Sequence, residues 1–150
     1  MNHFQVDFDY RLRSWARLRQ DVSDQILEKQ CVEIDNWWQQ APLMNHYLHW
    51  NDKETWPKPW ELLAENTYCA LAKALGICYT LLLIGVDNGE LAIATDNLGA
   101  EYYVVIVSSQ DEAVKYILSY HPNTVLSNKL QDFTIKNAIT FQTLKLRIRQ

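Results

Sequence analysis

The residue best suited to chemistry in this sequence is Cys69, in the run N-T-Y-C-A-L-A-K-A-L-G. Asn66 is a good N-cap, and it predicts a helix over residues 67–75 in which Cys69 occupies the third position. The positive end of a helix dipole favours a thiolate, the nucleophilic form of cysteine. The competing interpretation is a core residue, because cysteine is small and among the residue types most often buried.

A cysteine at the start of a helix that precedes an antiparallel sheet resembles the papain-like and transglutaminase-like enzymes, and the resemblance covers Cys69 to about Val107. Such enzymes need a histidine base on the following strands, with a carboxylate or amide to orient it. The predicted strands contain no histidine, since His121 follows them and His46 and His49 precede the cysteine. We therefore interpret Cys69 as a core residue, and keep a cysteine-dependent amide hydrolase or transferase as the alternative.

A second candidate site is the H-x-x-H-x-x-D series formed by His46, His49 and Asp52. On a helix these side chains would share one face, and imidazole suits zinc or copper. The series lacks a cysteine or a clear third ligand, and aromatic residues interleave with it. We expect packed, hydrogen-bonded imidazoles here, and no metal or cofactor.

The tryptophans are concentrated, with five of the six between Trp37 and Trp60 in a segment that contains three prolines. So much aromatic surface must pack, which predicts a lid or clamp. It serves either as an internal brace or as a protein interface, and a smaller alternative is a groove for a sugar or peptide. For the interface we nominate Trp50, Trp56 and Trp60, with Trp50 or Trp56 as the exposed anchor.

Composition limits the other possibilities. A chain of 150 residues with 48% hydrophobic residues is expected to form a single globular domain. Its net charge of -4 gives no reason to expect a nucleic-acid partner, and no apolar run is long enough to span a membrane. Three cysteines without C-x-x-C spacing, after a charged N-terminus, favour a reducing cytoplasm. The arginines of the first predicted helix, Arg13 and Arg17 among them, form a solvated face or a contact surface for an acidic partner.

The hydrophobic periodicity predicts an α+β fold. An antiparallel sheet of three to four strands is expected from residues 78–107, with helices mainly on one face. A D-N-G turn at residues 87–89 and a second turn at residues 96–99 would separate its first three strands. Alternating apolar residues also suggest an extended arm at residues 4–8 and a strand at residues 144–148. The helices are expected at residues 14–22, 24–40, 59–75 and 109–120.

The run from Tyr47 to Leu81 is similar to a small family of proteins of contractile-tailed phages, particularly cyanophages. The motifs R-L-R-S-W and W-W-x-x-A-P strengthen that resemblance, which covers residues 10–85. It implies a virion, tail or assembly component, located in the cytoplasm of the producing cell or in a virion. Our leading hypothesis rests on the excess of aromatic surface and the lack of a complete catalytic set. It is a non-enzymatic structural or interaction protein that binds protein partners or forms a homo-oligomer.

Overall fold

Two long helices begin the chain. The computed structural model describes residues 2–44, 48–120 and 125–148. Helix α1 (Phe8–Val22) starts earlier than residue 14, because the Asp7 carboxylate accepts a hydrogen bond from the Tyr10 N–H at 2.8 Å and caps it. The predicted extended arm is wrong, since residues 3–6 form turns and bends and residue 8 is already helical. Helix α2 (Leu27–Gln39) lies close to its predicted place.

The helix predicted at residues 59–75 is two helices, α3 (Pro59–Glu65) and α4 (Ala70–Leu83). Asn66 does not cap α4, because it ends α3 in the left-handed conformation, at φ 52°. Helix α4 continues past Gly76 through residues 78–83, which were predicted to be a strand. Every residue from Leu71 to Leu82 is buried, so α4 lacks the polar face that identifies an amphipathic helix.

The α+β class and the antiparallel sheet are confirmed. Among the described residues the sheet has five strands in the order β4-β3-β2-β1-β5. Only the two strands of the central hairpin match predicted strands. The helix predicted at residues 109–120 is wrong, since a turn and then β3 occupy that stretch. The strands are β1 (Gly89–Thr95), β2 (Glu101–Ser108), β3 (Lys115–Leu118), β4 (Leu126–Ser127) and β5 (Thr134–Thr140).

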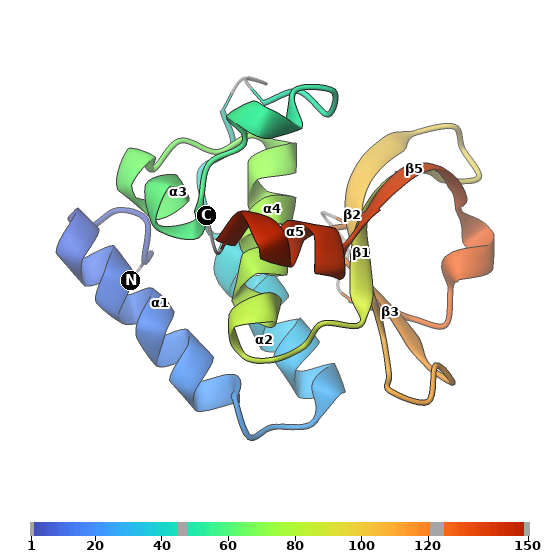
Figure 1. The fold of residues 1–150 in the computed structure, drawn as a ribbon, viewed down its shortest axis with the longest axis horizontal. Helices are drawn as coiled ribbons and strands as arrows, with labels where there is room; N and C mark the ends of the chain where they lie inside the picture. Colours follow the sequence, from blue (N-terminus) through green and yellow to red (C-terminus); the bar gives the residue numbers. More distant parts are fainter. Residues whose placement is uncertain (1, 45–47, 121–124, 149–150) are drawn as a thin grey trace.

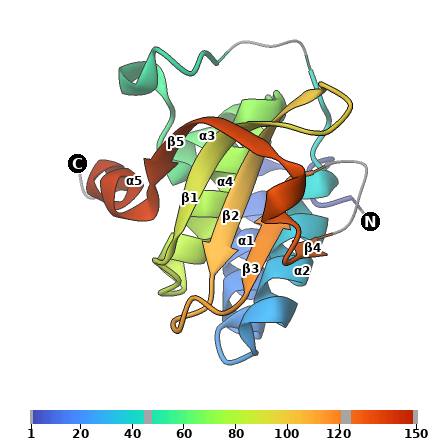
Figure 2. The same ribbon diagram turned by 90° about the vertical axis from the view of Figure 1, so that its right-hand side faces the viewer.

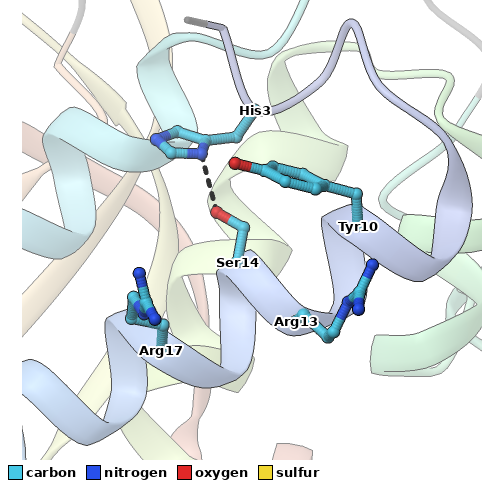
Figure 3. Close-up of a pocket in the computed structure, with 5 residues that line it drawn as sticks. All are labelled: His3, Tyr10, Arg13, Ser14 and Arg17. Atoms are coloured by element: carbon cyan, nitrogen blue, oxygen red, sulfur yellow. Dashed lines mark hydrogen bonds between the residues drawn. The ribbon is translucent and has the colours of Figure 1, made fainter.

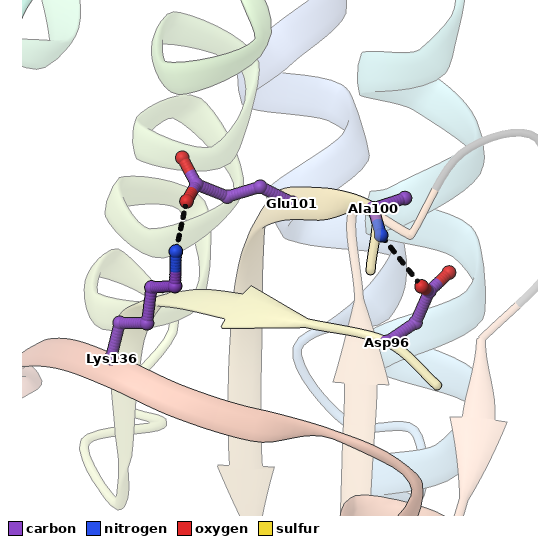
Figure 4. A network of polar contacts seen from close by, with 4 residues as sticks. All are labelled: Asp96, Ala100, Glu101 and Lys136. Carbon is purple, nitrogen blue, oxygen red and sulfur yellow. Dashed lines mark hydrogen bonds and ion pairs between the residues drawn. The ribbon is translucent and has the colours of Figure 1, made fainter. Parts of the chain in front are cut away.

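The turn between β1 and β2 is closed by Asp96. Its Oδ1 accepts hydrogen bonds from the N–H groups of Leu98 and Ala100, at 3.0 and 2.9 Å. On β5, Lys136 lies where the pairing with β1 shifts register, and its ammonium group reaches across β1 to Glu101 at 2.9 Å (Figure 4). Both side chains are about half exposed, so this ion pair adds little stability.

The helices cover one face of the sheet (Figures 1 and 2). Helix α4 lies in the centre, contacts α2 on one side and packs on β1 and β2. The other face holds a small apolar cluster around Val104 and Ile106, with Leu126, Leu130 and Phe133 against it. The 3-10 helix η2 (Leu130–Asp132) belongs to that covering segment. None of the helices among the described residues has the length and apolar character needed to cross a membrane.

The C-terminal strand predicted at residues 144–148 is wrong, because the stretch belongs to helix α5 (Phe141–Ile148). Phe141 and Leu144 are buried one turn apart, whereas Leu146 is 60% exposed. The buried residues of this segment therefore recur at helical spacing, and the alternation of apolar and basic residues does not match which side chains are buried. The helix packs on α4 and continues directly from β5.

Candidate functional site

Cys69 lies immediately before the central helix. It is the N-cap of α4, with extended backbone angles (φ -108°, ψ 178°), and not the third helical residue that we predicted. Its carbonyl oxygen accepts the first hydrogen bond of the helix, from the Lys73 N–H at 3.0 Å. Cys69 therefore lies at the positive end of the helix dipole, where the N–H groups of the first turn have no partner within the helix. Cys69 is only 1% exposed.

The residue from the sheet that lies near Cys69 is Tyr103, on β2. Burial raises the pKa of Tyr103, and the negative charges of Glu101 and of an ionised Cys69 raise it further. The Tyr103 ring stacks on the Trp50 ring, with centroids 6.3 Å apart and planes at 16°. Cys69 therefore has an aromatic pair in its neighbourhood, which we call the aromatic cover. In the papain-like arrangement a histidine is expected on such a strand, and here the position holds a phenol.

The tryptophan segment forms the outer part of this cover. The Trp50 and Trp56 rings meet edge to face at 5.7 Å, and the Lys53 ammonium group lies 4.8 Å from the centre of the Trp50 ring. Lys53 belongs to a short 3-10 helix, η1 (Lys53–Thr55). The prediction that Trp50 or Trp56 would be an exposed anchor is wrong, because they are 6% and 3% exposed. Trp60 is the exposed ring of the three, at 47%.

Below the cysteine, one turn along α4, lies a buried polar group built around Lys73. The Lys73 ammonium group donates to the Gln39 carbonyl oxygen at 3.5 Å, at the C-terminal end of α2. Burial lowers the pKa of Lys73, and the nearby Asp35 carboxylate only partly opposes that change. Asp35 also accepts a hydrogen bond from the Ser119 N–H at 2.8 Å. This group ties α4 to α2 and to the end of β3.

The histidines occupy different surroundings. His3 hydrogen-bonds through Nδ1 to the Ser14 hydroxyl at 2.7 Å. His49 is exposed, whereas Cys69 is buried. The carbonyl oxygen of His49 accepts a hydrogen bond from the Trp56 indole N–H at 2.9 Å. His46 and His121 lie outside the described residues. These hydrogen bonds of His3 and His49 do not identify the base that the cysteine-dependent alternative requires.

The remaining cysteines are core residues, as predicted for Cys31. Burial raises the pKa of Cys31 to about 12, with the charges of Asp35 and Glu28 adding to the effect. Burial also raises the pKa of Cys78 well above its usual value. Both thiols are fully buried, and all three cysteines are free. Cys69 alone combines a thiol with a helix N-terminus.

The proposed metal series His46, His49 and Asp52 is incomplete in the described part of the chain. His49 and Asp52 are both exposed, and His46 lies outside that part. No group of three or more His, Cys, Asp or Glu side chains among the described residues is arranged to hold a metal ion.

The comparisons with known proteins bear on the fold. No protein-family model matches the sequence, and no curated protein matches it either. The structure superposes on solved structures of LapG from Legionella pneumophila. The calcium-bound form has a TM-score of 0.73 and 16% identity, over 90% of this chain and 77% of that one. The chain shares the fold of LapG. An EGTA-treated form matches with a TM-score of 0.71 and 16% identity, over 90% of this chain and 75% of that one.

These matches correct two expectations from the sequence. LapG is a bacterial cysteine protease, so the resemblance to a phage family, with its virion, tail or assembly role, is wrong. The leading hypothesis of a non-enzymatic structural or interaction protein is likewise contradicted, and the matches favour the cysteine-dependent alternative. At 16% identity the likeness establishes the fold alone, and the activity is a separate proposal.

Proposed function

We propose that the protein is a cysteine-dependent amide hydrolase or transferase whose nucleophile is Cys69. The observation that carries the proposal is the place of Cys69, as the N-cap of the central helix against β2. The fold is shared with LapG, which acts as a cysteine protease. The buried Cys31 and Cys78 have raised pKa values, which leaves Cys69 as the candidate nucleophile.

The chemistry follows from the helix start. The Cys69 thiolate attacks the carbonyl carbon of an amide, the amine leaves with a proton, and a thioester joins the acyl group to the sulfur. Water then releases a carboxylic acid, or a second amine takes the acyl group. The N–H groups of the first turn of α4, including those of Leu71 and Ala72, would stabilise the oxyanion of the tetrahedral intermediate.

Access to the sulfur requires the aromatic cover to move. Cys69 is 1% exposed, and its neighbour Tyr103 stacks on the Trp50 ring. The proposal therefore includes opening of the Trp50 segment before an amide can bind. Such lids exclude water from the reacting bond once they close.

The proton acceptor is to be assigned by experiment, with His46, His49 and His121 as the candidates. The LapG match also raises calcium, since that protein has been solved calcium-bound. The described residues of this chain do not provide a fitting set of side-chain ligands, so we derive no step through a metal.

The test is amide cleavage or acyl transfer by the full chain, measured with a library of fluorogenic peptide amides and an added amine acceptor. C69S should abolish turnover, while the core variant C31S should keep it. One of the variants H46A, H49A and H121A should lose most of the rate, by roughly a hundredfold or more. Turnover that is equal in C69S and in the unaltered chain would refute the proposal, as would the absence of both turnover and any acyl adduct on Cys69.

A further inference from the structure

A second feature of the molecule is a hollow of about 340 Å³ beside α1, which we call the α1 hollow. It is separate from the Cys69 site, whose surroundings come from α4, β2 and the tryptophan segment. The hollow is formed by one face of α1 and by the turn that precedes that helix (Figure 3). Its lining residues are His3, Tyr10, Arg13, Ser14 and Arg17.

The back wall of the α1 hollow is held in place by hydrogen bonds. The Ser14 hydroxyl is 2.7 Å from His3 Nδ1, and it accepts the Trp37 indole N–H at 3.4 Å. The His3 ring also stacks on Trp37, with centroids 5.7 Å apart. The Ser14 hydroxyl therefore joins α1 both to the His3 ring and to the Trp37 indole. The wall is thus ordered before any ligand binds.

The arginines that line the hollow differ from the other arginines of α1, which make contacts within the fold. Four arginines belong to α1, and two of them have structural partners: Arg11 donates to the Leu63 carbonyl oxygen at 3.0 Å, and Arg19 lies 4.3 Å from the centre of the Trp15 ring. Among the described residues Arg13 and Arg17 form neither an ion pair nor a ring contact. Both are exposed and lie one turn apart, on either side of Ser14 (Figure 3).

The two exposed guanidinium groups suit an oxyanion with more than one charge. Two guanidinium groups one turn apart can each donate to the oxygens of a phosphate, which carries three acceptor oxygens and a charge of about -1.5 to -2 at pH 7. The Tyr10 hydroxyl has no partner among the described residues and points toward the His3–Ser14 hydrogen bond (Figure 3). It can therefore donate to the same anion.

The hollow is large enough for a phosphate that carries an organic group. A volume of about 340 Å³ is in the range of small-molecule sites, roughly 300 to 1,000 Å³, and exceeds what an inorganic phosphate fills. The Tyr10 ring provides an apolar surface for that group. We propose that the α1 hollow binds a small organic phosphate monoester through Arg13 and Arg17.

The test is isothermal titration calorimetry on the full chain with phenyl phosphate, inorganic phosphate and benzoate. Phenyl phosphate should bind at one site per chain, more tightly than inorganic phosphate and than benzoate. R13Q and R17Q should each weaken binding by about tenfold or more, because each removes a charge-assisted contact. K29Q is the matched control, since it removes an exposed helical charge on α2, and it should leave the affinity unchanged.

Three outcomes would overturn the proposal. The first is that phenyl phosphate shows no saturable binding up to roughly 10 mM. The second is that benzoate binds as tightly as phenyl phosphate. The third is that R13Q and R17Q lose no more affinity for phenyl phosphate than K29Q does. Melting temperatures of the two arginine variants should match that of the unaltered chain, because both side chains are exposed. C69S should bind phenyl phosphate normally, which separates this site from the proposed activity.

Discussion

The indole ring of Trp38 lies against the backbone of Gly76, with its Cη2 atom 2.5 Å from the point that a Cβ at residue 76 would occupy. The same indole donates its N–H to the Thr80 hydroxyl, one turn further along α4, at 3.0 Å. The glycine therefore lets α2 and α4 approach closely in the middle of the core. This contact explains why Gly76 lies inside a helix and does not end it.

Replacing Gly76 with alanine should destabilise the protein. In an exposed helix the change would stabilise by about 1 kcal/mol, but here the methyl group would overlap the Trp38 ring. Such overpacking typically costs about 1 to 3 kcal/mol. Urea denaturation of G76A measures the net effect of the gain in helix propensity and the cost of overpacking. A free energy of unfolding equal to or above that of the unaltered chain would contradict the close contact between Trp38 and Gly76.

Thr80 should be the most sensitive polar residue of the core. Its hydroxyl accepts the indole N–H groups of Trp15 and Trp38 at 2.9 and 3.0 Å, and donates to the Gly76 carbonyl oxygen at 2.7 Å. T80V leaves both indole donors buried without a partner, at about 1 to 3 kcal/mol each. T80S keeps the hydroxyl and should cost only about 1 kcal/mol, for the lost methyl group. Equal losses of stability in T80V and T80S would show that the Thr80 hydroxyl does not stabilise the core.

Stability should fall as the pH rises above about 9. Burial raises the pKa of Cys31 from 9.0 to about 12, and burial raises that of Tyr79 from 10.0 to about 12 despite the opposing charge of Arg147. In this window the unfolded chain releases protons that the folded chain retains, so the free energy of unfolding decreases with pH. Lys73, whose pKa is lowered, acts in the opposite direction just below pH 10.5.

Urea denaturation at about pH 8 and about pH 11 measures this change. The buried Cys78, whose pKa is also raised, acts in the same direction as Cys31 and Tyr79. The variant C31A removes one of these groups and should show a smaller decrease than the unaltered chain. A free energy of unfolding that stays level or rises over the interval would contradict the burial of these groups.

Alanine substitution of Trp56 and of Trp60 should have very different effects on stability, although the two residues are only four positions apart. Trp56 is 3% exposed, and W56A should cost about 3 to 5 kcal/mol. Trp60 is 47% exposed, and W60A should change the free energy of unfolding by less than about 1 kcal/mol. Similar losses in thermal or urea denaturation would contradict the different burial of the two rings.

The sequence was sufficient where a segment carries a clear local signal. Helix α2 lies close to its predicted place because its buried residues recur at helical spacing. The β1–β2 hairpin was located by its turn residues and its β-branched and aromatic residues, although the last five residues of β2 are all buried. It was insufficient for α4, since a helix buried on all sides has the same continuous apolar pattern as a buried strand. Strand β5 was missed for the opposite reason, because most of its residues are exposed.

The candidate site was partly predictable. A cysteine near a helix start was visible in the sequence, although its cap position depends on Asn66 ending α3. The proximity of Tyr103 was not visible, because it depends on how α4 lies across β2, which local sequence does not encode. The stacking of Trp50 on Tyr103 joins segments that are far apart in the chain, and polar neighbours of Trp50 suggested exposure instead.

The most direct test of the proposed nucleophile is competition among the three cysteines for iodoacetamide. The native chain is labelled at about pH 7, and peptide mass spectrometry follows each site over time. Cys69 should be labelled well before Cys31 and Cys78, whose raised pKa values hold them as buried thiols. C69S should take up no label until the chain is unfolded. Labelling of Cys69 no faster than that of Cys31 and Cys78 would contradict the assignment of Cys69 as the reactive thiol.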